Sequence, residues 1–212
     1  MFTNRERELE TLERGYASGK AELFVLYGRR RVGKTELLRE FCRGKPHIFY
    51  VADLGTEATA LAEFTRQIST FAYGRPDAIS PFASWDAAFE FLVPYARKKR
   101  LVMVLDEFTY LIEINKAIPS ILQRLWDTRL KNTRLMLILC GSYVGMMEQH
   151  VLGYRAPLYG RRTGQWKLMP LDFWAAQAFF PISVPRTGCA RSPSWEAFRH
   201  TCPTFKIVQT HG

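Results

Sequence analysis

One eight-residue loop constrains the fold of this chain more than any other part of its sequence. At positions 28–35 the chain follows the pattern G-x-x-x-x-G-K-S/T. A strand-like apolar run at 23–27 enters this loop, and a helix-like stretch at 36–41 leaves it. In that setting the glycines let the backbone curl, so that successive N–H groups and the positive end of a helix face one anion. The pattern therefore predicts a strand, a phosphate-binding loop and a helix in direct succession.

The loop pattern also assigns roles to individual side chains. Lys34 is expected to reach the β- and γ-phosphates of a nucleoside triphosphate, and the Thr35 hydroxyl is expected to hold Mg²⁺. The arginines of the loop are expected to be solvated or close to phosphate rather than catalytic. A basic turn that only imitates the pattern is the alternative, and the flanking strand and helix argue against it. The residues predicted to bind nucleotide are Gly28, Arg29, Arg30, Arg31, Val32, Gly33, Lys34 and Thr35.

A second part of the site is predicted farther along the chain. The run at 101–105 is apolar at every position and ends at Asp106 and Glu107, as expected for a strand buried on both faces of a parallel sheet. Its acidic end would lie at the carboxyl edge, where ligands bind in open α/β sheets. Asp106 is expected to hold Mg²⁺, directly or through water, and Glu107 to activate the attacking water as general base. Alone, this pair could be a solvated strand end, but beside the loop it indicates a catalytic site.

Two more apolar runs, at 47–51 and 135–140, indicate further strands. A strand inserted between the loop and the acidic pair, with Glu directly after Asp, is typical of additional-strand P-loop ATPases. The sequence thus predicts a three-layer α/β fold with a mostly parallel five-stranded core sheet, whose fifth strand lies at 165–169. Ser142, which follows the run at 135–140, is expected to sense the γ-phosphate. It could instead cap a helix that begins near Tyr143, and one hydroxyl can do both.

These motifs together resemble the archaeal-type ATPase family, which is related to AAA-type and signal-transduction NTPases. The resemblance covers residues 1 to about 180. It implies ATP binding and slow hydrolysis on a three-layer α/β fold, but it does not imply a particular substrate or process. In the family the N-terminal region lies near the adenine, so Asn4 and Arg5 are candidates for contact with the base. The matching segments are 2–9, 27–35, 105–108, 140–142, 158–164 and 168–171.

Arg161 and Arg162 lie just before the predicted fifth strand. In AAA-type ATPases an arginine at this place commonly reaches a neighbouring subunit's site and stabilises the charge of the γ-phosphate. The resemblance therefore implies that Arg161 or Arg162 acts on the nucleotide, either in a second copy of the chain or within its own. The alternative is a surface loop whose charge is structural or incidental.

Composition limits the remaining possibilities. The chain has 212 residues, is 47% apolar and carries a formal net charge of +10, which suits one sizeable α/β core. Part of the positive charge is expected to meet ATP. The rest lies on solvated faces or contacts a protein or DNA partner, although no DNA-reading helix is recognisable. No apolar run is long enough to span a bilayer, and the start of the chain is charged where a secretory signal would be apolar. Four cysteines without metal-ligand spacing favour a reducing cytoplasm.

Helical spacing predicts helices at 5–17, 57–73, 84–98 and 117–130, with Pro94 favouring a kink or an early stop in the third. After residue 180 the periodic patterns end. We therefore divide the chain into an ATPase core at 1–180 and an irregular tail at 181–212. The tail stands where the family has a helical lid and a winged-helix region, which suggests a truncated or frame-altered member. Two functions remain open: an ATPase with slow turnover, or a nucleotide-dependent binding module without useful catalysis.

Overall fold

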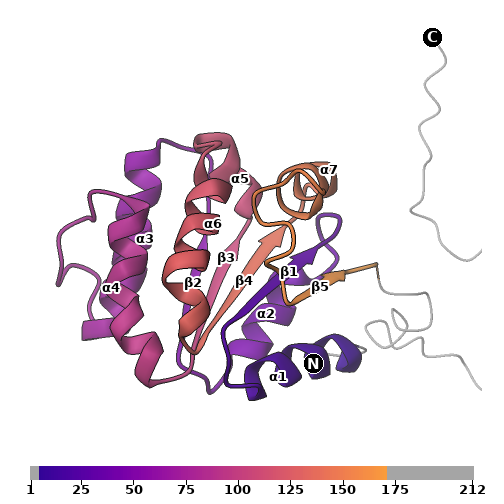
Figure 1. Cartoon of the computed structure of the whole chain (residues 1–212), viewed down its shortest axis with the longest axis horizontal. Coiled ribbons are helices and arrows are strands. Elements are labelled where there is room, and N and C mark those ends of the chain that lie inside the picture. Colours follow the sequence, from indigo (N-terminus) through magenta and orange to yellow (C-terminus); the bar gives the residue numbers. More distant parts are fainter. Residues whose placement is uncertain (1–4, 171–212) are drawn as a thin grey trace, which may run out of the picture.

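The computed structural model describes residues 5–170, and a five-stranded sheet forms its middle layer (Figure 1). The strand order is β2-β3-β4-β1-β5, and every neighbouring pair is parallel. The predicted fold class is therefore confirmed. β4 lies between the strand that enters the loop and the strand that ends in the acidic pair, and β2 forms one edge. The strands are β1 (Glu22–Tyr27), β2 (His47–Val51), β3 (Leu101–Asp106), β4 (Leu135–Gly141) and β5 (Gly164–Lys167).

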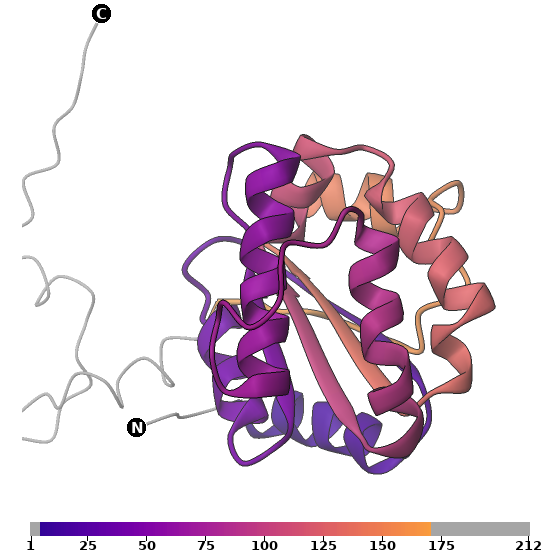
Figure 2. The same ribbon diagram turned by 90° about the vertical axis from the view of Figure 1, so that its left-hand side faces the viewer.

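Helices cover both faces of the sheet (Figures 1 and 2). One face packs against α1 (Glu6–Ala17) and α2 (Lys34–Cys42). The other packs against α3 (Glu57–Tyr73), α4 (Trp85–Lys98), α5 (Phe108–Ile114) and α6 (Ile118–Thr128). A 3₁₀ turn (Leu130–Asn132), α7 (Val144–Met147) and a π-helical turn (Glu148–Leu152) complete the described elements.

The central strands explain why the core has two halves. Every residue of β3 and β4 is buried, as their unbroken apolar sequence predicts. Because side chains alternate across a strand, Leu23 and Val25 join the cluster under α3 to α6, whereas Phe24 and Leu26 join the cluster under α1 and α2. Because all the strands are parallel, their ends and the polar residues that follow them lie at a common edge of the sheet.

Pro94 lies inside α4 without ending it. The helix continues to Lys98, so the early stop that this proline predicts is wrong. Leu92, Val93 and Ala96 around the proline are buried, and their packing offsets the missing backbone hydrogen bond. None of the helices within residues 5–170 is both long and apolar enough to cross a membrane.

Candidate nucleotide site

The loop at 28–35 connects the end of β1 to the start of α2. Gly28 donates its N–H to the Gly141 carbonyl at 3.3 Å, which fixes the loop against the end of β4. A Cβ at position 28 would lie 2.3 Å from the Leu168 carbonyl oxygen, so only glycine fits there. Gly33, with φ of 89°, precedes the first residue of α2, and its left-handed backbone turns the chain into the helix. The loop is thereby held in the curl that its sequence predicts.

Lys34 occupies the inside of this curl. Its side chain is buried, and its Nζ donates to the carbonyl oxygens of Gly28 at 3.0 Å and Arg29 at 2.8 Å. These two carbonyls of the loop satisfy the ammonium group.

Thr35 and Asp106 meet across the gap between α2 and β3. Thr35 Oγ1 donates to Asp106 Oδ2 at 2.7 Å, and Glu107 N–H donates to Asp106 Oδ1 at 2.9 Å. Asp106 is 1% exposed. Below it, burial first and the negative charge of Asp106 second raise the pKa of the Cys140 thiol well above its ordinary value. The Thr35 hydroxyl and the Asp106 carboxylate thus lie together beside an uncharged thiol. Hydroxyl and carboxylate oxygens are ligands that Mg²⁺ prefers.

Glu107 adopts a strained backbone at the start of α5. Its φ is 50° and its ψ is 42°, in the left-handed region that few non-glycine residues occupy and that is concentrated at functional sites. Ser142 Oγ donates to Glu107 Oε1 at 2.6 Å. Glu107 Oε2 is buried and has no hydrogen-bond partner among the described residues. One carboxylate oxygen is therefore fixed by Ser142, and the other is buried without a partner.

Ser142 contacts this carboxylate and does not cap the helix that follows it. The N-cap of α7 is Tyr143, and no side chain caps it. The capping alternative is therefore wrong, and the serine lies between the loop and the acidic pair. Lys34, Thr35, Asp106, Glu107 and Ser142 form one cluster at the carboxyl edge of the sheet.

Arg161 and Arg162 lie at the opposite edge. Thr163, next in the chain, donates its N–H to the Leu23 carbonyl near the start of β1, whereas the loop follows the end of that strand. Arg161 forms a forked ion pair with Asp127 at 2.8–3.0 Å. Arg162 donates to the Leu152 carbonyl and lies over the Tyr159 ring. The structure does not bring either arginine to the loop of its own chain.

Arg5 has a different role from base contact. Its buried guanidinium donates to the carbonyl oxygens of Val32 at 3.0 Å and Met169 at 2.7 Å, and pairs with Glu8 at 2.9 Å. It thus supports the loop from behind. Asn4, the other candidate for contact with adenine, lies outside the described residues.

Sequence reasoning missed Tyr110. The Arg30 guanidinium donates a hydrogen bond to the Tyr110 hydroxyl and lies 5.9 Å from the centre of its ring. Tyr110 comes three residues after Glu107, one turn along α5. That spacing is the signal that could have identified it, because residues three apart on a helix share a face.

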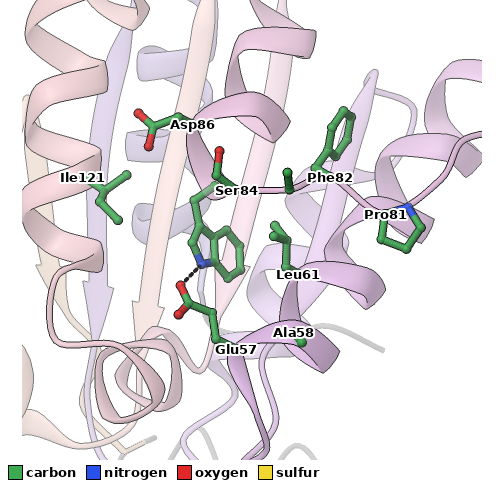
Figure 3. Close-up of a pocket in the computed structure, with 10 residues that line it drawn as sticks. Glu57, Ala58, Leu61, Pro81, Phe82, Ser84, Asp86 and Ile121 are labelled. Carbon is green, nitrogen blue, oxygen red and sulfur yellow. Dashed lines mark hydrogen bonds between the residues drawn. The ribbon is translucent and has the colours of Figure 1, made fainter.

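Two pockets differ in their relation to this cluster. The first, of about 480 Å³, adjoins the loop and is lined by Gly28, Arg29, Val144, Lys167, Leu168, Met169 and Pro170. The second, of about 560 Å³, lies where α3 and α4 begin, with Ile121 of α6 on its far side (Figure 3). There Glu57 accepts hydrogen bonds from Trp85 Nε1 and Asn115 Nδ2. The second pocket includes none of the predicted site residues.

Comparisons with known proteins identify the family of this chain. Residues 2–185 match the model of an ATPase domain found predominantly in Archaea. The uncharacterised protein MJECL04 of Methanocaldococcus jannaschii is 38% identical over 185 residues, covering 87% of this chain and 39% of its own. The uncharacterised ATP-binding protein MJ0423 of the same organism is 58% identical over 45 residues, covering 21% of this chain and 76% of its own.

Solved structures show the same architecture. The Walker-type ATPase PABY2304 of Pyrococcus abyssi superposes with a TM-score of 0.66 at 26% identity, covering 84% of this chain and 57% of the other. Drosophila ORC bound to DNA, at 20% identity and a TM-score of 0.61, covers 84% and 46%; this likeness shows the P-loop fold alone. The chain spans well under two thirds of MJECL04 and of PABY2304. By its family match and its fold, this nucleotide-binding chain belongs to the ATPase domains found predominantly in Archaea.

Proposed function

We propose that this domain binds ATP with Mg²⁺ and hydrolyses it slowly to ADP and phosphate. The observation that carries the proposal is the Glu107 carboxylate, which has one oxygen held by Ser142 and the other buried without a hydrogen-bond partner among the described residues. An orphaned buried carboxylate oxygen costs stability unless a ligand or water satisfies it. Its place beside the Thr35–Asp106 pair supports a general base.

Thr35 and Asp106 are the residues that would hold Mg²⁺. Their oxygens are 2.7 Å apart and turned toward each other, so a small oxygen-seeking cation fits between them after a modest separation. The metal would neutralise charge on the β- and γ-phosphates during transfer.

The steps assigned to the chain's own residues follow from these contacts. Backbone N–H groups of the loop and of the α2 N-terminus bind the phosphates, and Lys34 leaves its two carbonyl acceptors for the β- and γ-oxygens. Glu107 accepts a proton from water as the water oxygen bonds to the γ-phosphorus. The bond from that phosphorus to the ADP oxygen then breaks, which yields ADP and inorganic phosphate. Ser142 keeps the Glu107 carboxylate turned toward the water.

The pocket beside the loop is the place that we propose for the nucleoside. It opens between Arg29, Val144 and the chain at 167–170, and its mixed lining suits a base and a sugar. We also propose that the chain divides into a core at 1–180 and a tail at 181–212, because the periodic patterns of the core end after residue 180. Limited proteolysis that destroys nucleotide binding together with the tail would contradict this division.

A second copy of the chain is the partner proposed for Arg161 and Arg162. Both lie near the start of β5, away from their own loop, so only a neighbouring molecule could receive them. Turnover per site that does not change with protein concentration would contradict an arginine supplied by a second copy.

A protein or DNA partner is proposed only from the net charge of +10. A cytoplasmic location is proposed from the free, buried thiols of Cys42 and Cys140.

Single-turnover ATP hydrolysis with Mg²⁺ tests the proposed function. Wild type should convert bound ATP to ADP, and Glu107→Gln should bind ATP with unchanged affinity but lose hydrolysis by about 100-fold or more. Lys34→Ala should weaken ATP binding itself. Wild type that binds ATP without turnover would identify a nucleotide-dependent switch, and Glu107→Gln with normal turnover would remove Glu107 from the mechanism.

A further inference from the structure

We propose that Arg30 is a catalytic arginine supplied within the chain, which contacts the γ-phosphate of bound ATP, and that Tyr110 positions it. This inference rests on the proposed function of the site. It goes beyond that function by naming Arg30 as the residue that contacts the γ-phosphate, which ATP has and ADP lacks.

The first observation is that Arg30 differs from its neighbours in the loop. Arg29, Arg30 and Arg31 are all exposed. Among the described residues only Arg30 of the three has a partner for its guanidinium, namely the hydroxyl and ring face of Tyr110. A long exposed side chain loses rotamer freedom when it is held. The contact therefore holds the Arg30 side chain in one orientation, in which it extends from the loop toward Tyr110 of α5.

The second observation is what lies at each end of that direction. At the loop end, the carbonyl of Arg29 accepts the Lys34 ammonium, so Arg30 leaves the backbone beside the group that faces the β- and γ-phosphates. At the far end, the Tyr110 N–H donates to the Glu107 carbonyl at 2.8 Å. The guanidinium therefore lies between the phosphate-facing lysine and the helix that begins at the general base. A γ-phosphate bound by Lys34 and attacked by a water on Glu107 would therefore lie close to the Arg30 guanidinium.

The third observation concerns rigidity and remaining donors. Tyr110 is half-buried, and its ring packs against the core beneath α5, so its hydroxyl is a fixed acceptor. One N–H of the guanidinium is used there, and a planar fork of other donors stays available for phosphate oxygens. Arg161, in contrast, has its fork filled by Asp127. Arg30 is thus the arginine poised to meet charge that develops on the γ-phosphate.

The test compares affinities for ATP and ADP, using a non-hydrolysable ATP analogue, on the full chain. Arg30→Ala should lower single-turnover hydrolysis by about 100-fold and affinity for the ATP analogue by about tenfold, with affinity for ADP unchanged. The loss should be the same at low and high protein concentration, because the arginine acts within its own chain. Arg43→Ala, a change at a well exposed arginine just after α2 that pairs with Glu40, is the control and should alter none of these values.

Tyr110→Phe keeps the ring and removes only the hydroxyl. It should lower hydrolysis several-fold in wild type and have no further effect in the Arg30→Ala background, since coupled residues are not additive. Equal weakening of ADP and ATP-analogue binding by Arg30→Ala, or wild-type hydrolysis in that variant, would overturn the proposal while leaving the ATPase function intact. Absence of both binding and turnover in wild type would instead overturn the proposed function on which it rests.

Discussion

At the scale of single residues, the loop is defined by backbone positions as much as by charged side chains. Gly28 lies so close to the Leu168 carbonyl that a Cβ would overlap it at 2.3 Å. Glu107 holds a left-handed backbone at the start of α5, which aims its carboxylate at Ser142. Both positions keep a conformation that ordinary side chains resist, at the two ends of the space where phosphate is proposed to bind.

Gly28→Ala should therefore damage both stability and nucleotide binding. The added methyl group has to displace the chain at Leu168, and overpacking of this kind costs about 1–3 kcal/mol of unfolding free energy. Chemical denaturation and ATP titration measure the two effects. Gly145→Ala is the matched control, because a Cβ there meets nothing within 4 Å and alanine favours the helix. Equal stability of the two variants would show that the loop can shift without cost.

At the scale of elements, the ion pair of Arg161 and Asp127 connects the segment before β5 to the end of α6. Arg161, hydrogen-bonded to the carboxylate of Asp127, holds the pKa of Asp127 below its ordinary value of 3.8. A carboxylate whose pKa is lowered by folding stabilises the folded state when the pH is above its unfolded-state pKa. This stabilisation is lost as the pH falls through its folded-state pKa. Solvent screens this partly exposed pair, so its contribution is about 0.5 kcal/mol.

Asp127→Asn should thus lower unfolding free energy at neutral pH by about 0.5 kcal/mol, and the two proteins should converge in stability as the pH falls through the lowered pKa of Asp127. Urea unfolding at pH 7 and at low pH gives both values. Asp77→Asn is a suitable control, since Asp77 is well exposed and its contact with Arg66 is longer, at 3.4 Å. If the stability difference between Asp127→Asn and wild type were the same at low pH as at pH 7, the Asp127 side chain would stabilise the fold by its packing rather than by its charge.

The elements were largely predictable, and the side-chain pairs between them were not. Unbroken apolar runs identified β1, β3 and β4, since burial on both faces leaves a plain signature. The fifth strand runs Gly164–Lys167 and not 165–169, because its boundary depends on pairing with β1. The pairing of Thr35 with Asp106 followed from a known loop pattern. The spacing from Glu107 could have placed Tyr110 near the site, but its contact with Arg30 joins segments 80 residues apart, and no local pattern predicts that partner.

At the scale of the whole molecule, Arg5 joins parts of the chain that are far apart in sequence. It precedes α1, and its guanidinium binds the loop at Val32 and the chain beyond β5 at Met169. Pairing of β5 with β1 brings these two segments close to each other, and the buried guanidinium then joins their carbonyl oxygens. The same contacts place one residue behind both the phosphate loop and the wall of the pocket proposed for the nucleoside.

Arg5→Ala should leave buried carbonyls and Glu8 without their donor, and so lower the free energy of unfolding by about 2 kcal/mol. For a domain of this size, that loss corresponds to a melting temperature about 4–8 °C lower. Arg7→Ala, two residues farther on and exposed, should melt within a degree or so of wild type. Affinity for ATP should fall in the Arg5 variant as well, because the loop loses its support from behind. If both variants melt alike, the loop and the end of β5 are held by their backbone contacts, namely Gly28 with Gly141 and Leu168 with Tyr27, and Arg5 only fills the space between them.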